Sequence, residues 1–367
     1  MPPTDLIANA TWQLEVCNAC RYCEGYCAVF PAVERRRSFT EADVHYLANL
    51  CHDCRPCYYA CMYAPPHEFA VNIPQVFSEV RRRTYDRYAV PRVLADLAAS
   101  GWRFAALVAG LALLFFVAVA ALAGGGAGFF ATHEGPGAFY AVIPYAALFL
   151  PTLAVALFGA AALAIGGLRY WRETWGSPRD LLNARALAGA GVDALAGRLL
   201  QGGENDGCSY PAEPASRWRW VLHLLVLWGF IAALVATAVA FLYQDLLGIL
   251  PPYPLLSLPV ALGTLGGVAM IVGASGLIYL KWRSDPAPAD REHVRRDYLF
   301  LVLFDVVSLT GMLLLLLRGT AAMNVLLIVH VATVFALFLT APYGKFAHFL
   351  YRYAALVQNR LETGRQN

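Results

Sequence analysis

Charged residues are scarce in this sequence. Asp, Glu, Lys and Arg make up 14% of the 367 residues, whereas hydrophobic residues make up 59%. Soluble globular domains carry about 25% charged residues, so this composition excludes a chain built only of soluble domains. Most of the polypeptide is expected in a lipid bilayer. The net charge of +3 is too small to indicate a nucleic-acid partner, and we expect none.

Cysteine is almost absent after residue 61. Eight of the nine cysteines precede that point, and Cys208 is the ninth. The sequence opens without the basic and then apolar run of a secretory signal peptide, which predicts that its N-terminus stays in a reducing cytoplasm. A disulfide framework, typical of small secreted domains, is not expected there. The clustered cysteines therefore indicate metal ligands, and Cys208 is expected to be a free thiol.

Long runs without charge predict six membrane-spanning helices, because about 20 apolar residues cross a bilayer as a helix. We expect spans at about 104–123, 139–168, 220–243, 254–280, 298–317 and 321–343. Lys and Arg concentrate in the connections after the second and fourth spans, which predicts that both termini are cytoplasmic. In the first of these connections, residues 178–200 predict an amphipathic helix. It either docks the cysteine-containing domain or lies on the membrane surface.

The eight clustered cysteines form two copies of one spacing, Cys-x2-Cys-x2-Cys-x3-Cys. Each copy supplies the four thiolates that a 4Fe–4S cluster requires. Zinc is the alternative, but tetrahedral zinc sites use cysteine pairs that lie further apart in the sequence. In two-cluster proteins the fourth cysteine of a run serves the other cluster. We therefore expect two ligand sets: Cys17, Cys20, Cys23 and Cys61 in the first, and Cys51, Cys54, Cys57 and Cys27 in the second.

A helix is predicted between the two cysteine runs. Thr40 to Asp43 resemble a capping box, which begins a helix over Glu41–Leu50 and delivers Cys51. This helical connection favours an α-helical ferredoxin domain over the small βαββαβ type. The abrupt change of composition near residue 100 predicts two domains, a cytoplasmic ferredoxin-like domain at 1–100 and a membrane domain at 101–367.

Histidines in or near the spans are functional candidates, because an ionisable side chain in a bilayer is costly. On one continuous helix, His330 and His348 would lie about five turns and 27 Å apart on the same face, with Pro342 between them as a possible kink. His223 and His348 share a depth near the cytoplasmic side. Two imidazoles on facing helices predict a b-type haem. Ordinary interfacial histidines are the alternative.

A second haem at His330 is left open, because Ala233 stands where the third span would offer a second ligand. Asp305 lies within the fifth span and has three possible roles. It would relay a proton to a quinone, orient the free nitrogen of His223, or form a hydrogen bond between helices. We expect the last of these.

Several segments resemble the tricarballylate/citrate-utilization protein B family, called TcuB or CitB. They run from Cys17 to Pro31, from His45 to Cys51, from Tyr63 to Ala70 and from Leu339 to Phe346. The resemblance covers nearly the whole chain. It implies a bacterial inner-membrane protein with two iron–sulfur clusters and haem, which reoxidises the FAD of a soluble tricarballylate dehydrogenase and reduces membrane quinone. A related fused protein acts in corrin-ring synthesis, so the partner stays open.

The last span also resembles that of the haem-binding gamma subunit of respiratory nitrate reductase, in which two histidines at this separation serve two haems. Pro342, Tyr343 and His348 match that pattern, and Ala233 departs from it. Together, the two resemblances imply a mainly α protein. A helical ferredoxin domain with two 4Fe–4S clusters would precede a six-helix, cytochrome b-like transmembrane bundle.

No residue suggests a nucleophile or an acid–base pair, so substrate chemistry is expected on a partner protein. We predict an electron-transfer subunit that carries electrons from a flavoprotein through two clusters and haem to quinone. A membrane transporter gated by a redox-sensitive cluster domain is the alternative. The sequence has no detectable inverted repeat, and several of its spans lack charged residues, which disfavours a transporter.

Overall fold

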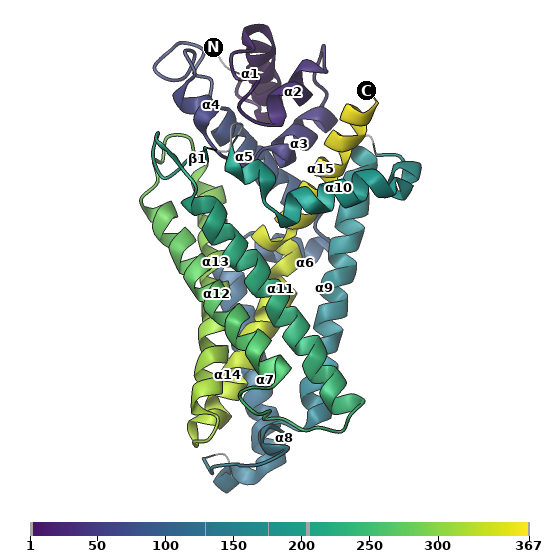
Figure 1. Ribbon diagram of the computed structural model, residues 1–367, viewed down its shortest axis with the longest axis vertical. Helices are drawn as coiled ribbons and strands as arrows, with labels where there is room; N and C mark the ends of the chain where they lie inside the picture. Colours follow the sequence, from purple (N-terminus) through teal and green to yellow (C-terminus); the bar gives the residue numbers. More distant parts are fainter. Residues whose placement is uncertain (1–2, 129, 175, 203–205, 366–367) are drawn as a thin grey trace.

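The computed structural model describes residues 3–128, 130–174, 176–202 and 206–365. These residues are mainly α-helical, as the sequence predicted, with one antiparallel pair of short strands, β1 (Cys208–Ser209) and β2 (Ala215–Ser216). Figure 1 shows long helices side by side along the vertical axis. The N-terminal helices and the C-terminus gather at the upper end of this bundle.

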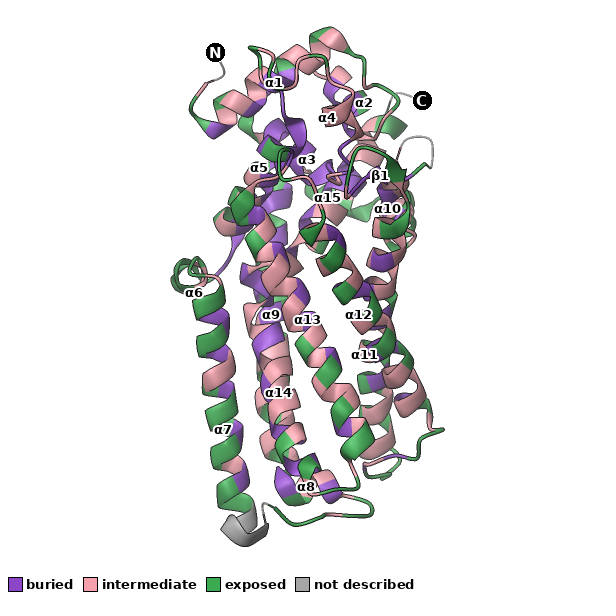
Figure 2. Cartoon of the chain, turned by 90° about the vertical axis from the view of Figure 1, so that its left-hand side faces the viewer, coloured by how far each residue is buried: buried purple, intermediate pink, exposed green. Residues whose placement is uncertain are grey.

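Among the described residues, six helices are long and apolar enough to cross a membrane, in agreement with the predicted number of spans. They are α7 (Trp102–Gly128), α9 (Tyr145–Glu173), α11 (Trp218–Asp245), α12 (Leu258–Trp282), α13 (Arg291–Leu317) and α14 (Ala322–Thr340). Large apolar side chains such as Leu107, Leu111 and Leu114 of α7 are more than half exposed, and Figure 2 shows α7 as a largely exposed helix. An exposed apolar surface of this kind is suited to contact with lipid. With six such helices, the chain is a multi-pass membrane protein.

The second span begins later than the sequence indicated. Residues expected at its start form the separate short helix α8 (Ala138–Val142), and Pro144 in an extended conformation precedes α9. The fifth span begins earlier, since α13 starts at Arg291 rather than near residue 298.

The N-terminal region consists of short helices. They are α1 (Leu6–Cys20), α2 (Val29–Glu34), α3 (Glu41–Leu50), α4 (Pro56–Tyr59), α5 (Ile73–Tyr88) and α6 (Arg92–Ala98). The predicted capping box is present, because the Asp43 N–H donates to the Thr40 hydroxyl and the Thr40 N–H donates to the Asp43 carboxylate. These bonds begin α3 at Glu41, and the helix ends at Leu50, directly before Cys51, as expected.

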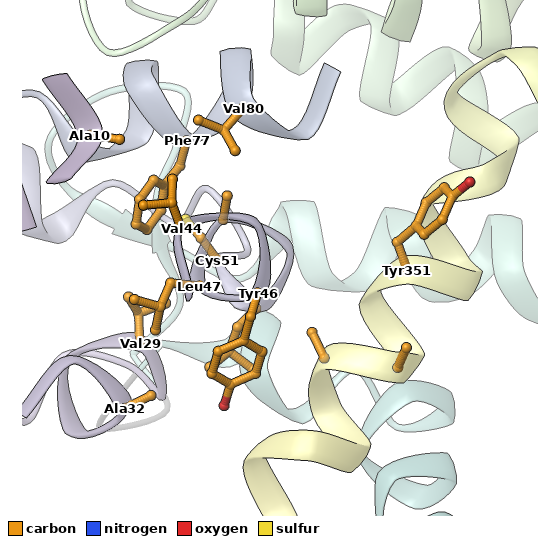
Figure 3. Packing of buried hydrophobic residues seen from close by; sticks show 14 of the residues in the cluster. Ala10, Val29, Ala32, Val44, Tyr46, Leu47, Cys51, Phe77, Val80 and Tyr351 are labelled. Atoms are coloured by element: carbon orange, nitrogen blue, oxygen red, sulfur yellow. The ribbon is translucent and has the colours of Figure 1, made fainter. Parts of the chain in front are cut away.

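The last helix, α15 (His348–Gly364), packs into the N-terminal region. Tyr351 of α15 stacks on Tyr85 of α5, with ring centroids 5.6 Å apart, and Arg36 pairs with Glu362 at 2.6 Å. Figure 3 shows Tyr351 on α15 beside the cluster of apolar residues that surrounds α3. The chain therefore returns at its end to the core formed at its beginning.

His330 and His348 do not share one continuous helix. α14 ends at Thr340, and two 3-10 turns follow, η3 (Ala341–Tyr343) and η4 (Lys345–Ala347), before α15 begins. The interruption includes Pro342, so the break falls at the kink that the sequence suggested. The calculated alignment of the two histidines on one helical face does not apply.

Within residues 178–200, the regular α-helix is shorter than the sequence predicted. It forms η1 (Pro178–Leu182), α10 (Ala184–Leu195) and the start of η2 (Arg198–Gln201). The Tyr353 hydroxyl of α15 donates to the Leu187 carbonyl at 3.1 Å, and Arg360 pairs with Asp193 at 2.6 Å. The amphipathic helix thus docks on α15, and through α15 it joins the N-terminal core.

Glycines bring α11 and α12 into direct backbone contact. A Cβ atom added to Gly229 would lie 2.8 Å from the Gly266 carbonyl oxygen, and one added to Gly266 would lie 2.6 Å from the Gly229 oxygen. Small residues of this kind allow close helix packing in membranes, where dispersion contacts replace the hydrophobic effect. Gly263, one turn before Gly266, would place its Cβ 3.8 Å from Ala236.

We predict that Gly266→Ala destabilises the bundle by about 2 kcal/mol, because the added methyl group must push α11 away from α12. Thermal unfolding of the detergent-solubilised protein, followed by circular dichroism, measures this effect. Gly263→Ala is the matched control and should unfold like the parent protein. Equal losses in the two variants would contradict the close packing at Gly266.

Candidate functional site

The first group of thiols joins three cysteines of the first run to the last cysteine of the second. α1 ends at Cys20, where Arg21 adopts a left-handed conformation with φ of 57°, and the following turn carries Cys23. Burial, together with the thiols of Cys61, Cys23 and Cys20, raises the pKa of Cys17. Burial, Cys61 and Cys20 raise the pKa of Cys23 to about 12. All four thiols line one cavity.

The second group contains the four remaining clustered cysteines: Cys27, Cys51, Cys54 and Cys57. A hydrogen bond with Cys27 and burial raise the pKa of Cys54 well above its usual value. Burial and the nearby thiols of Cys54 and Cys51 raise the pKa of Cys57 well above its usual value. Asp53 and Arg55 have positive φ and bend the loop, and the Asp53 N–H donates to the Cys51 sulfur at 3.4 Å. The loop therefore folds around its own thiols.

Cys61 lies beside the first run, and Cys27 lies beside the second. Cys57 also lies near Cys23 and Cys17 and lines their cavity, so the two groups are neighbours. Within the described parts of the chain, no three His, Cys, Asp or Glu side chains have the close spacing of a single-ion site.

Buried arginines surround the second group. Arg81 is 1% exposed and donates to the carbonyls of Ala48 and Cys51. Burial and the nearby Arg81 lower the pKa of Arg352 to about 10. The Nε atoms of both arginines are buried and lack a hydrogen-bond partner. Because an uncompensated buried cation is costly, this surrounding favours an anionic group, and a cluster held by four thiolates is formally anionic.

His223 of α11 and His348 of α15 face each other. Their ring centroids lie 6.4 Å apart, and their planes are nearly perpendicular, at 85°. A metal binds an imidazole nitrogen at about 2 Å, so two rings on opposite sides of one metal have centroids about 6 Å apart. His348 Nδ1 donates to the Lys345 carbonyl at 2.7 Å, which leaves Nε2 for a ligand. The buried Nδ1 of His223 has no partner.

Two arginines connect this histidine pair to the second cysteine loop. Arg219, one turn before His223 on α11, donates to the carbonyls of His52 at 2.8 Å and Asp53 at 2.6 Å. Arg352, one turn after His348 on α15, donates to the carbonyl of Cys51 at 3.0 Å. The loop is thus attached to both helices that carry the pair.

The sequence prediction did not include either arginine. Each lies four residues from a histidine, which places both side chains on one helix face, and this spacing was the available signal.

His330 packs against α13 rather than α11. Its Nδ1 lies 3.1 Å from the Thr310 hydroxyl, and a Cβ atom at Gly311 would lie 2.9 Å from the ring. Ala233, where the sequence lacked a second ligand, lies instead against Gly266 of α12. The structure therefore does not bring His330 to the other histidines named here.

Asp305 and Cys208 have local partners. Asp305 accepts a hydrogen bond from Ser275 of α12 at 2.9 Å, which is the expected bond between helices. Cys208 forms no disulfide, as expected. It is fully buried, however, donates to the Leu200 carbonyl at 3.2 Å, and packs in one cluster with Cys54.

Comparison with known proteins identifies the family. The model of citrate utilization protein B matches residues 100–367, and a protein of that name from Escherichia coli is 42% identical over 353 residues, 96% of this chain and 91% of the relative. The chain belongs to the citrate utilization protein B family. The family's Fer4-like domain matches residues 10–87, which makes the N-terminal region an iron–sulfur domain. No solved structure matches the chain.

Cys61 belongs to the second run, but we predict that Cys61→Ala frees the thiols of the first run from their cluster. Iron per chain should fall by about four atoms, because one 4Fe–4S cluster is lost. Iodoacetamide should then modify Cys17, Cys20 and Cys23 in the folded protein, as peptide mass spectrometry would detect.

Cys208→Ser is the control and should keep its full iron content and its protected thiols. Modification of the second run in Cys61→Ala, with the first run still protected, would overturn this grouping.

Proposed function

We propose that this protein is a membrane electron-transfer subunit of citrate or tricarballylate utilization. It carries electrons from a reduced, soluble FAD-dependent dehydrogenase through two 4Fe–4S clusters and one b-type haem to a membrane quinone. One observation carries this proposal. Arg219 and Arg352 attach the second cysteine loop to the two helices that hold the facing pair His223 and His348. Redox centres bound at these places would be neighbours.

The first thiol group is the entry point in this proposal. Tyr22 and Met62 line its cavity and are 59% and 62% exposed, so a soluble flavoprotein can approach it. Cys57 lies near thiols of both groups. The loop that carries the second group is attached to the helices of the histidine pair. The bound clusters and haem supply one-electron carriers between flavin and quinone, which each exchange two electrons.

The residues of this chain hold these groups and tune them. The thiolates fix each cluster, and the guanidinium groups of the buried Arg81 and the partly buried Arg352 stabilise added negative charge. The bond from His348 Nδ1 to the Lys345 carbonyl fixes the ring and directs Nε2 to the metal. His330, with its Nδ1 near Thr310, provides no ligand in this proposal.

The proposed location is the bacterial inner membrane, with both termini in the cytoplasm. Lys and Arg concentrate in the connection between α9 and α11 and at the adjoining ends of α12 and α13, with Lys281 on α12 and Arg291, Arg295 and Arg296 on α13. The positive-inside rule places both regions on the cytoplasmic side. The cysteine-containing region lies at that same end of the bundle (Figure 1). Its clusters would then face the compartment of a soluble dehydrogenase.

The decisive experiment is anaerobic purification, followed by a reduced-minus-oxidised spectrum with iron, sulfide and haem quantitation. The parent protein should contain both cluster iron and haem, and its reduced form should be reoxidised by a quinone analogue. We predict that His348→Ala and His223→Ala each abolish the haem bands, because one imidazole alone holds the iron weakly. Both variants should keep their cluster iron.

His133→Ala is the control in the membrane domain and should keep the haem bands. Full haem content in both His223→Ala and His348→Ala would show that this histidine pair does not bind the haem. A parent protein without iron would refute the function as a whole.

A charge substitution tests the role of the arginines. Arg352→Gln keeps a hydrogen-bond donor but removes a buried positive charge, so the reduced, more negative cluster loses stabilisation. We predict that the midpoint potential of the second cluster falls by roughly 60 mV, a tenfold change in a one-electron equilibrium. Redox titration followed by electron paramagnetic resonance measures the shift. The exposed Arg83→Gln is the control, and an equal shift there would contradict a local effect.

A further inference from the structure

A cleft lies beside the histidine pair, at the end of the bundle near the cysteine-containing region. It opens between the first turns of α7, the first half of α13 and the segment that follows α14, and about 50 Å³ of it is accessible to water, more than a single water molecule requires. Its walls are largely apolar and include Phe104, Ala105, Leu299, Phe300, Leu303 and Phe346.

Lys345 brings a polar group to this apolar cleft. An ammonium group has three N–H donors. The Nζ atom of Lys345 lies 2.9 Å from a carboxylate oxygen of Asp297 and 2.8 Å from Nε2 of His293. These two partners leave one N–H available to an acceptor in the cleft. Arg296, which also lines the cleft, is held by a two-point ion pair with Asp86.

Aromatic rings connect the cleft to His348. The Phe300 ring, which lines the cleft, lies 6.3 Å from the His348 ring, centroid to centroid. The Phe346 ring lies 6.0 Å from that of Phe300. A molecule in the cleft would therefore be separated from the imidazole pair by about the thickness of one side chain.

The cleft borders the lipid-facing surface. Ala105 points into it, whereas the next residues of α7, Ala106 and Leu107, are exposed on the apolar outer surface. A ligand that enters here is therefore soluble in the bilayer, apolar enough to contact the side chains of Phe104 and Phe300, and equipped with a hydrogen-bond acceptor for Lys345.

We propose that this cleft binds the headgroup of a membrane quinone, with the Lys345 ammonium group donating a hydrogen bond to a quinone carbonyl oxygen. The inference rests on the proposed function and locates its acceptor site. Reduction of the quinone to quinol there consumes two electrons, which come from the flavoprotein, and two protons, which come from water on the cytoplasmic side.

Filling the cleft tests this proposal. Ala105→Trp should lower the rate at which a short-chain quinone analogue reoxidises the dithionite-reduced protein by at least about tenfold, an effect equivalent to a tenfold loss of affinity. The spectrum of the variant and its reoxidation by ferricyanide should not change. Ala106→Trp, on the outer face of the same turn, is the control and should react like the parent protein. Leu303→Trp fills the cleft from the opposite wall and should repeat the effect of Ala105→Trp.

Photolabelling separates binding from electron transfer. An azidoquinone analogue, added to the oxidised parent protein in lipid vesicles, should label peptides of α7 and α13 that line the cleft, and excess unlabelled quinone should abolish the label. Normal reoxidation of both tryptophan variants by quinone, or labelling elsewhere that unlabelled quinone abolishes, would overturn the site while the proposed function stands. A parent protein that ferricyanide reoxidises and quinone does not would overturn both.

Discussion

Burying positive charge is costly unless negative charge accompanies it, and the centre of this protein contains an excess of buried cations. Arg81, Arg219 and Arg352 donate to backbone carbonyls of the second cysteine loop, but a carbonyl offers a dipole rather than a full charge. A buried ion costs several kcal/mol when uncompensated. In the proposed holoprotein, an anionic cluster offsets this cost, and the arginines in turn hold its ligand loop against α11 and α15. Cluster binding and attachment of the iron–sulfur domain to the membrane helices then depend on each other.

The interruption between α14 and α15 gives the last part of the chain two environments. A continuous helix would carry His348 and the residues after it along the axis of the last span. The 3-10 turns over residues 341–347 redirect the chain, and the Tyr343 hydroxyl secures the turn by donating to the Val90 carbonyl at 2.9 Å. His348 then faces His223, while Tyr351, one turn later, enters the N-terminal core. One helix therefore positions a candidate ligand and joins the two parts of the chain.

Local signals in the sequence were sufficient for much of this fold. Hydropathy predicted the six spans, and the Thr40 capping box predicted where α3 begins. Partners that are distant in the sequence left no such signal. The first turns of α13 carry charge and read as a loop, yet Arg296 pairs with Asp86 and Asp297 with Lys281, so helix extends back to Arg291. The arginines that attach the cysteine loop carried a local signal, their spacing of four residues from a histidine, but their partners in the loop are more than 150 residues away.

The excess of positive charge extends from the cysteine loop to the histidine pair. Asp297 is one carboxylate between two ammonium groups, Lys281 at 2.7 Å and Lys345 at 2.9 Å, and the Lys345 carbonyl orients His348. Nearby cations stabilise the reduced form of a redox centre because reduction adds negative charge, so they raise its potential. Centres at the second cysteine group and at His348 would therefore accept electrons more readily than the same centres in a neutral surrounding. In the proposed function, the raised potentials at the second cysteine group and at His348 would draw electrons towards the bilayer.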